Sequence, residues 1–366
     1  MHVSVIDPVL QTNLFVAFLV AAVLLTSKRD PKPHEMSHSR TDELKGVAIL
    51  MVIFSHIGYF LFFDHKFMYP LSVAGGVGVN IFLFLSGFGL TASENKSHKS
   101  IWQFYSKRLK NIFVPMWLML TPLLIFDFYL LKRTYSVTAV LQNVLGFFPN
   151  SDINTAINSP LWYFSLIFFY YLIFPLVYWR NRPFLSIFVI LLLSFIATNL
   201  KLPVTVDILK VYKLHLLAFP LGMAFAWFNE NKPVVLFREK LLQALSVSWT
   251  AQLLSYLLTV SLTLLFAYTA INSGVGEGIR KEQLLSLITT MSLVFISLIK
   301  NVRSNLLITL GKYSYEIYLI HWPLMYRYDF IYKNTSAFLG TLLYIAFFIV
   351  VGFALNRTAK VVLNSE

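Results

Sequence analysis

The sequence has no cysteine and few acidic side chains. The absence of cysteine excludes disulfides, thiolate metal ligands and a cysteine nucleophile. Asp and Glu together number 17 of 366 residues, and charged residues of both signs make up only 13%. Hydrophobic residues make up 57%, which is too apolar for a soluble domain whose surface must be wetted. The composition therefore indicates an integral membrane protein.

The shortage of acidic residues leaves a net charge of +13. The basic residues sit in short segments between long apolar runs, where they would flank membrane spans and meet anionic lipid headgroups. This placement indicates membrane topology and lipid contact, and not the binding of nucleic acid.

Apolar stretches long enough to cross the hydrocarbon core recur along the whole chain. We expect an all-α, polytopic helical membrane protein with about 10–11 transmembrane helices. Residues 1–366 would form one domain, without internal repeats. The first run lacks a basic leading segment and a small-residue cleavage site, so we expect a retained span. The expected spans are 9–27, 47–63, 76–93, 112–131, 160–179, 183–199, 214–229, 246–271, 284–299, 305–326 and 336–355.

The charges of the connections predict the orientation. One alternate set, which begins with 28–45, holds twenty of the 30 Lys and Arg residues, and the opposite set holds ten. This bias places the N-terminus outside and the C-terminus in the cytoplasm. The longest outer connection, 132–158, contains the apolar stretch Val140 to Phe148. That stretch is too short to span, and we expect it to lie in the interface or to re-enter.

His56 is the polar residue of greatest interest, because it lies partway along an apolar span. Lys45 precedes it by eleven positions, so both project from one helix face with roughly 16 Å of rise between them. Lys45, at the cytoplasmic edge, suits the binding of an anionic phosphate, and a neutral His56 suits a base. The alternative is a structural histidine bonded to a neighbouring helix. Ionisable residues within spans are expensive, which favours a functional role.

Two other spans carry polar groups. In span 76–93, the hydroxyl of Ser86 either bonds its own helix or reaches across to a site, and the glycines before it suit close helix packing. In span 305–326, Glu316 needs a partner, which would be Lys312, a histidine elsewhere or its own proton. The density of polar groups there predicts a water-filled cavity.

Two charged residues in or near span 112–131 are further candidates. Arg108 belongs to a basic run with interleaved aromatic residues. This run is either an interfacial helix or a site for an anionic cofactor, with Arg108 best placed for phosphate. Asp127 is an intramembrane acid with no motif around it, and we interpret it as a helix-pairing residue.

Taken together, these elements resemble the acyltransferase-3 family of integral membrane acyltransferases, which includes O-acetyltransferases of bacterial surface polysaccharides. Lys45 and His56 look like the family's signature of a basic residue and a histidine, with lysine where arginine is commoner. Arg108 matches the first of the family's two arginines, and Asn111 occupies the second position. The matching stretches are Arg40 to His56, Asn80 to Leu90, Arg108 to Pro115, Leu161 to Tyr163 with Tyr170 and Pro175, and Gly311 to Pro323.

The resemblance implies transfer of an acyl group, most often acetyl from acetyl-CoA, to a hydroxyl of a glycan or lipid-linked glycan. It also implies a bacterial plasma membrane, no tightly bound cofactor and no metal. The CoA phosphates would rest on Lys45 and Arg108, with Asp42 beside them, and the pantetheine arm would run along span 47–63. His56 would then deprotonate the acceptor hydroxyl, or become acylated and relay the group.

The remaining roles follow from the same resemblance. Catalytic roles are expected for His56, Glu316 and Ser86. The oxyanion would be met by Ser86, Tyr315 or His321, and Ser314 belongs to the same string. Trp162 and Tyr163 either stack against a sugar or anchor the protein at the membrane interface.

Two other functions remain as alternatives. A proton-coupled transporter would use Glu316, His56 and His321 as a pathway, but the paired halves typical of such transporters are not found. A glycan flippase or export component would share the aromatic lining, but gives no reason for Lys45 and His56 to share a face.

Overall fold

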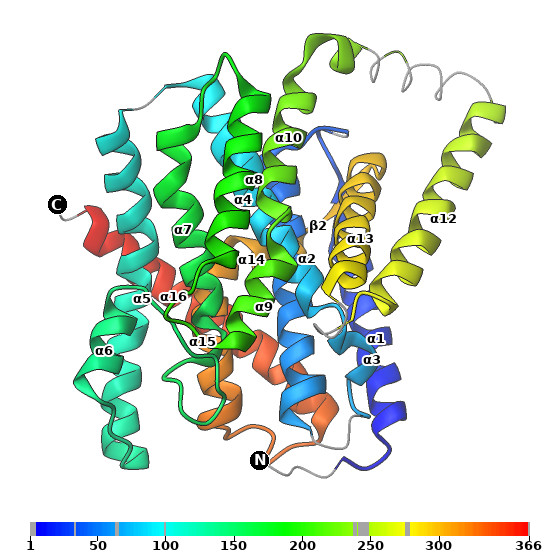
Figure 1. The fold of residues 1–366 in the computed structure, drawn as a ribbon. Coiled ribbons are helices and arrows are strands. Elements are labelled where there is room, and N and C mark those ends of the chain that lie inside the picture. Colours follow the sequence, from blue (N-terminus) through cyan, green and yellow to red (C-terminus); the bar gives the residue numbers. More distant parts are fainter. Residues whose placement is uncertain are drawn as a thin grey trace.

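The computed structural model describes residues 5–32, 34–62, 66–98, 100–236, 240, 249–274 and 279–364. Long helices run side by side between the two ends of the molecule (Figure 1). Within these residues, eight helical stretches are long and apolar enough to cross a membrane, and Pro183–Asn199 and Tyr256–Ile271 are shorter apolar helices. The prediction of an all-α, multi-pass membrane protein is confirmed.

Helices account for most of the described chain. In chain order they are α1 (Pro8–Leu25), α2 (His38–Ser55) continued by the π-helical η1 (His56–Leu61), α3 (Tyr69–Ser72), α4 (Gly75–Lys96), α5 (Ile101–Leu131), α6 (Val137–Val144), the 3-10 turn η2 (Ser159–Leu161), α7 (Trp162–Val177), α8 (Pro183–Asn199), α9 (Val206–His215), α10 (Ala218–Glu230), α12 (Trp249–Ile271), α13 (Ile279–Ile299), α14 (Asn305–Lys312), α15 (Ser314–Trp322), the π-helical η3 (Pro323–Arg327) and α16 (Ala337–Asn364).

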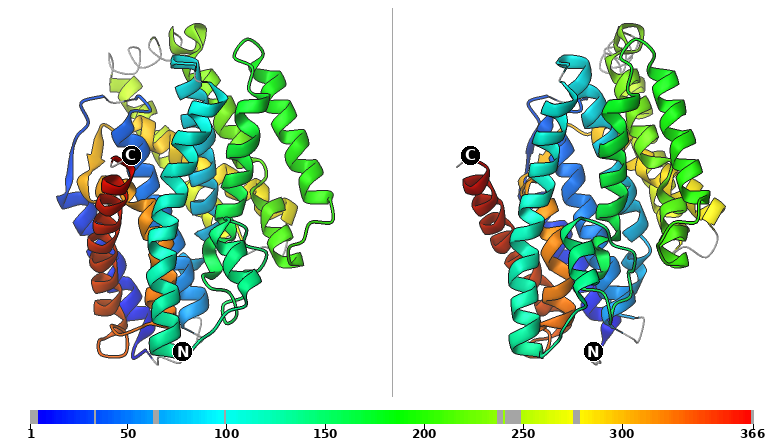
Figure 2. Two further views of the ribbon diagram at one scale, coloured as in Figure 1. Left: turned by 90° about the vertical axis from the view of Figure 1, so that its left-hand side faces the viewer. Right: turned by 60° about the vertical axis from the view of Figure 1, so that its left-hand side comes forward.

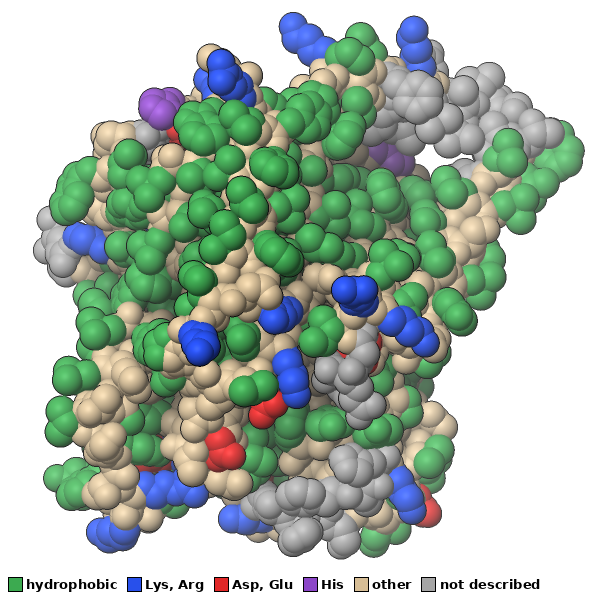
Figure 3. Space-filling model, in the orientation of Figure 1, with side chains coloured by type: hydrophobic (Ala, Val, Ile, Leu, Met, Phe, Trp, Pro, Cys, Tyr) green, Lys and Arg blue, Asp and Glu red, His purple; other side chains and the backbone are tan. Residues whose placement is uncertain are grey.

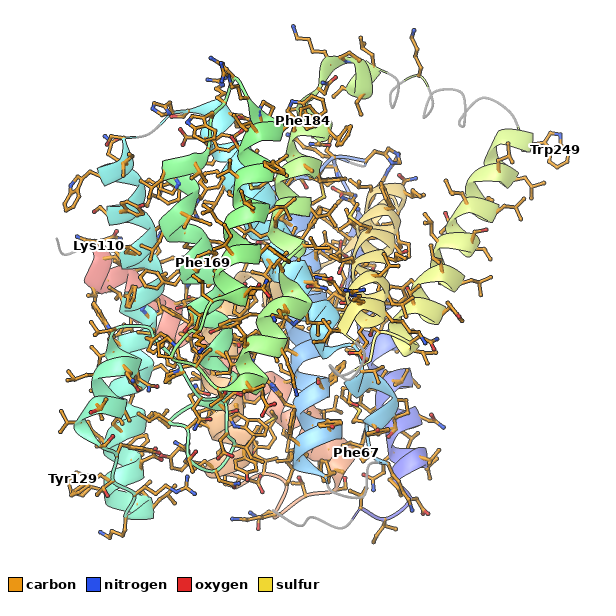
Figure 4. All side chains as sticks on the ribbon, viewed as in Figure 1. Phe67, Lys110, Tyr129, Phe169, Phe184 and Trp249 are labelled. Atoms are coloured by element: carbon orange, nitrogen blue, oxygen red, sulfur yellow. The ribbon has the colours of Figure 1, made fainter. Side chains whose placement is uncertain are left out.

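The two ends of the molecule correspond to the two predicted sides of the membrane. Phe184 and Trp249 lie at the end that the loop charges predict to be cytoplasmic, and Phe67 and Tyr129 lie at the opposite end (Figure 4). Helix α5 runs through nearly the full height of the molecule in both views of Figure 2. Hydrophobic side chains cover much of the face in Figure 3, while Lys and Arg lie along its edges and in a band across it.

A small sheet joins the first helix to the C-terminal part of the chain. Strand β1 (Ser27–Arg29) pairs antiparallel with β2 (Val302–Ser304). Two ion pairs lie beside this sheet: a fully buried one between Arg40 and Asp30, and a partly buried one between Lys300 Nζ and Glu43 Oε1 at 2.8 Å. Because buried charges are stable only when they are paired, these contacts fix the start of α2 against the sheet.

The predicted span 305–326 is divided between two helices. Helix α14 ends at Lys312, Tyr313 has φ −108° and ψ 13°, and α15 begins one residue later. The two halves have different partners, because α14 packs along α2 and α15 packs against α16. Helices α2 and α14 approach closely because Gly46 has no side chain. A Cβ on Gly46 would lie 2.0 Å from the carbonyl oxygen of Leu307.

The outer connection 132–158 contains the apolar stretch as a short helix. Helix α6 begins at the N-cap Ser136, whose hydroxyl accepts from the backbone amide of Ala139. Trp117 of α5 donates its indole N–H to the carbonyl of Val144 at 2.8 Å. This bond holds the end of α6 against α5.

Candidate active site

A cavity of about 450 Å³ lies among α2, α4, α7, α9 and α15. His56 and Trp322 line one part of it, and Trp162 and His215 line another. Ser151, in the predicted outer connection, also lines it. The cavity therefore faces the predicted outer side of the membrane.

Two histidines meet in the wall of this cavity. His56 Nδ1 lies 2.7 Å from His321 Nε2, and the two rings are nearly parallel, with centroids 4.9 Å apart and an angle of 13° between planes. His321 is fully buried, whereas His56 is half-buried and lines the cavity. The structure thus joins the predicted histidine of span 47–63 to the histidine of the C-terminal string.

The hydrogen bonds of His321 decide the tautomer of both neutral rings. His321 Nδ1 donates to the carbonyls of Tyr318, at 2.9 Å, and Ile317, at 3.2 Å. Its Nε2 is therefore the acceptor, and His56 Nδ1 must carry the hydrogen between the rings. Nε2 of His56 is left with its lone pair, and the described residues offer no hydrogen bond to it. This lone pair is available to accept a proton or to attack an electrophile.

Both histidines lie where an α-helix changes to π-helical geometry. His56 is the first residue of η1, and His321 precedes η3 by two positions. A π-turn changes the direction in which the following side chains leave the helix, and such turns are frequent at functional sites. Trp322 packs beside His56, with ring centroids 5.1 Å apart, and stacks on Tyr326 at 4.7 Å.

Hydrogen bonds hold the outer connection over the cavity. Asn158 Nδ2 donates to the carbonyl of Leu319 at 2.9 Å, and the hydroxyl of Tyr318 donates to the carbonyl of Pro160. Nearer the mouth, the backbone amides of Thr155 and Asn154 lower the pKa of Asp152 below its usual value. These hydrogen bonds thus hold the outer connection against α15.

Asp127 lies at the centre of a second set of contacts below this wall. Its carboxylate accepts from Arg327 Nη1 at 2.5 Å, from the hydroxyl of Tyr135 at 2.7 Å and from that of Tyr328 at 2.5 Å. Arg327 Nη2 donates to the carbonyl of Ile157 at 2.8 Å. Asp127 therefore joins α5 to η3 and the outer connection, which agrees with its interpretation as a helix-pairing residue.

Lys45 lies apart from the cavity. Its ammonium pairs with Asp42 at 3.1 Å, and its side chain is 38% exposed. Between Lys45 and His56, the same face of α2 carries Ala48, Ile49 and Val52, all buried. Lys45 does not line the cavity that contains His56, and these three buried side chains lie between the two residues along the helix.

The other predicted residues divide between the cavity and its surroundings. Trp162 lines the cavity, whereas Ser86 and Tyr163 do not. Tyr315 donates its hydroxyl to the carbonyl of Ile112 at 2.5 Å. Glu316 accepts from Asn356 Nδ2 at 2.7 Å and does not bond either histidine.

Two further predicted positions complete this placement. Arg108 is half-buried within α5, with no ion pair among the described residues. Ser314 is buried at the start of α15. Neither lines the cavity.

The sequence reasoning missed His215, which is 2% exposed and lines the cavity. His215 Nδ1 lies 2.7 Å from Asn80 Oδ1, and Asn80 Nδ2 donates to Ser286 Oγ at 2.5 Å. A sequence signal existed, because Asn80 and His215 are polar residues within otherwise apolar segments. Nothing local indicated that they meet.

Comparisons with known proteins assign the chain to a family. The acyltransferase domain of the acyltransferase-3 type matches residues 40–357. The chain is also similar to the O-acetyl transferase of Shigella phage Sf6, with 25% identity over 302 residues that cover 77% of this chain and 83% of the relative. No solved structure matches the chain. The matched region contains both members of the histidine pair.

Proposed function

The chain belongs to the acyltransferase-3 family and is a membrane O-acyltransferase, and on this premise we propose that His56 and His321 transfer an acetyl group from cytoplasmic acetyl-CoA to a hydroxyl of a cell-surface or lipid-linked glycan. The observation that carries the proposal is the 2.7 Å contact between the two rings in the wall of a cavity, which faces the side that the loop charges predict to be outside. We place the protein in a bacterial plasma membrane, which gives it access to both substrates.

In direct transfer, His56 acts as a general base. Its Nε2 takes the proton of the acceptor hydroxyl while that oxygen attacks the thioester carbonyl. The C–S bond breaks, and the CoA thiolate takes the proton from His56. While His56 is an imidazolium, its Nδ1–H bond to His321 is charge-assisted and stronger, which stabilises the transition state.

In a relay, the same atom acts as a nucleophile. Nε2 of His56 attacks the thioester, the CoA thiolate leaves, and the ring becomes an acyl-imidazolium whose Nδ1–H still bonds His321. The acceptor hydroxyl then attacks this acyl group, the bond from the acyl carbon to Nε2 breaks, and Nε2 regains its lone pair. The hydroxyl proton passes to solvent, which supplies the proton that the CoA thiolate takes up. Both routes need the tautomer that His321 selects.

An oxyanion donor should lie beside His56. The predicted candidates Tyr315 and His321 have other partners, and Ser86 does not line the cavity. Ser55 precedes His56 and lines the cavity, and among the described residues its hydroxyl has no hydrogen-bond partner. We assign this hydroxyl as the donor to the tetrahedral intermediate.

The acyl donor, acetyl-CoA, would arrive from the opposite side of the membrane to the acceptor. We propose that the CoA phosphates rest on Lys45 and Arg108 at the predicted cytoplasmic end. Because Ala48 and Ile49 fill the face of α2 between Lys45 and His56, the acyl arm must displace this packing. Access of the donor would thus require a local opening beside α2, whereas the acceptor's cavity is already open.

The test is an assay of purified protein in lipid nanodiscs with radiolabelled acetyl-CoA and deacetylated cell-envelope glycan. Removal of a general base typically costs about 10²-fold to 10⁴-fold, so His56→Ala should lower transfer by that amount. His98→Ala is the matched control, because its ring is 84% exposed and lies outside the cavity. Undiminished transfer by His56→Ala would remove His56 from the mechanism.

A further inference from the structure

His215 is a second imidazole in the wall of the same cavity. Helix α9 lines the cavity with a single face, formed by Asp207, Lys210, Val211, Leu214 and His215. This spacing corresponds to one side of a helix, so His215 lies two turns, or about 12 Å, deeper than Asp207. The charged pair of Asp207 and Lys210, 3.6 Å apart, lies at the mouth, and the deep end is neutral.

Three helices fix the orientation of this ring. Asn80 of α4 accepts from His215 Nδ1, and Asn80 itself donates to Ser286 of α13. All three side chains are almost fully buried, with exposed fractions of 2%, 0% and 2% for His215, Asn80 and Ser286. Trp162 stacks on the imidazole, with ring centroids 5.7 Å apart and 15° between planes. Such a chain selects one tautomer and one ring position.

The hydrogen-bond chain ends at the cavity. Because Nδ1 of His215 donates to Asn80, its Nε2 is an acceptor, and the part of the chain that the structure describes offers it no donor. Gly76 leaves room near the ring, since a Cβ there would lie 3.6 Å from His215 Cε1 and meet no other atom within 4 Å. The hydrogen bonds from His215 through Asn80 to Ser286 join three helices, but this structural role uses only Nδ1 of His215. It leaves Nε2 available to a ligand.

We propose that His215 binds the acceptor, with Nε2 accepting a hydrogen bond from a second hydroxyl of the sugar that is being acylated. This inference rests on the proposed function. It makes the acceptor a polyhydroxylated sugar, held at one hydroxyl by His215 while another faces Nε2 of His56. Because Trp162 covers one face of the imidazole, the sugar must approach from the cavity side near Gly76.

The experiment compares His215→Ala with wild type in the nanodisc assay. The probes are methyl glycosides that wild type acetylates and their monodeoxy derivatives. Loss of one buried hydrogen bond should raise the KM for the acceptor about 10-fold to 100-fold in His215→Ala. Acetyl-CoA hydrolysis without acceptor should fall by a much smaller factor than transfer, because no sugar takes part in it. With wild type, the deoxy derivative that lacks the bound hydroxyl should have a KM raised by the same factor. With His215→Ala, removal of this hydroxyl should raise the KM no further.

Two controls separate binding from a purely structural role. Ser286→Ala removes only the far end of the chain and should give a smaller rise in the KM for the acceptor, and His98→Gln should give none. An unchanged KM in His215→Ala would overturn the inference, as would an equal fall in acceptor-free hydrolysis and in transfer. Absence of transfer and hydrolysis in wild type would overturn the proposed function, and the inference with it.

Discussion

His56 Nδ1 and His321 Nε2 lie 2.7 Å apart although 265 positions separate them in the chain. Since His321 Nδ1 already donates to the carbonyl of Tyr318, the hydrogen between the two rings belongs to His56. Each ring therefore has a different task. His321 selects the tautomer, and His56 presents a free lone pair to the cavity.

His321→Ala should lower kcat about 10-fold to 100-fold, because loss of an orienting partner typically has an effect of this size. The KM for acetyl-CoA should change little, and the loss should be smaller than that of His56→Ala. Steady-state kinetics of both variants give this comparison. Equal losses of kcat in the two variants would contradict the division of tasks and show that both rings take part directly.

The sequence singled out His56 and His321 as polar residues within apolar segments, but it did not predict their contact. Each lies in an apolar segment where a polar residue stands out, and that signal is local. Their contact depends on the register between α2 and the C-terminal helices, which Gly46 sets through its close approach to Leu307. A register between helices depends on which side chains pack together, and this information is not contained in either segment alone.

The break at Tyr313 and the role of His215 escaped prediction for a similar reason. Hydropathy runs unbroken across 305–326, but α14 and α15 have different packing partners. His215 lies at the edge of a predicted span, and its polarity alone does not indicate which residues it contacts. Only the fold brings Asn80 and Ser286 to it, from helices that precede and follow it in the chain.

The absence of cysteine allows the cavity to be tested by thiol labelling in an otherwise unreactive protein. Val211→Cys should react with a membrane-impermeant thiol reagent added outside intact cells, because Val211 lines the cavity. Ala48→Cys should not, because Ala48 is fully buried. Mass spectrometry of the purified variants measures the labelled fraction. Labelling of Val211→Cys only from the cytoplasmic side would contradict the predicted orientation.

Asp127 and Arg327 form a buried pair whose separation should be strongly destabilising. Their side chains are 0% and 5% exposed, so Asp127→Leu leaves a buried guanidinium without its carboxylate. Breaking such a pair costs about 3–5 kcal/mol, and the variant should unfold at lower temperature in detergent. The double variant Asp127→Leu with Arg327→Met should recover part of the loss, since neither charge remains. A double variant less stable than both single variants would contradict this account.

Two glycines of α4 provide a matched test of helix packing. A Cβ on Gly87 would lie 2.2 Å from the carbonyl oxygen of Phe219, whereas a Cβ on Gly89 would meet nothing within 4 Å. Gly87→Ala should therefore force α4 and α10 apart and lower stability by about 1–3 kcal/mol. Gly89→Ala should raise stability by up to about 1 kcal/mol, because alanine favours the helix. Thermal unfolding of the two variants in the same detergent measures both changes.

Lys45 provides the test of the donor site. If its ammonium binds a phosphate of acetyl-CoA, Lys45→Ala should raise the KM for acetyl-CoA about 10-fold, as expected for loss of a charge-assisted contact, and leave kcat nearly unchanged. S-acetyl-pantetheine lacks the nucleotide phosphates, so its KM should be the same in wild type and in Lys45→Ala.

The comparison of the two donors distinguishes phosphate binding from a structural role of Lys45. Lys45→Arg keeps the charge and should bind acetyl-CoA at least as well as wild type, because the guanidinium can contact phosphate through two N–H groups. A structural role would raise KM for both donors by the same factor, since the pair with Asp42 would be lost whichever donor is present. That result would place the phosphate site elsewhere on the cytoplasmic end, with Arg108 as the next residue to vary.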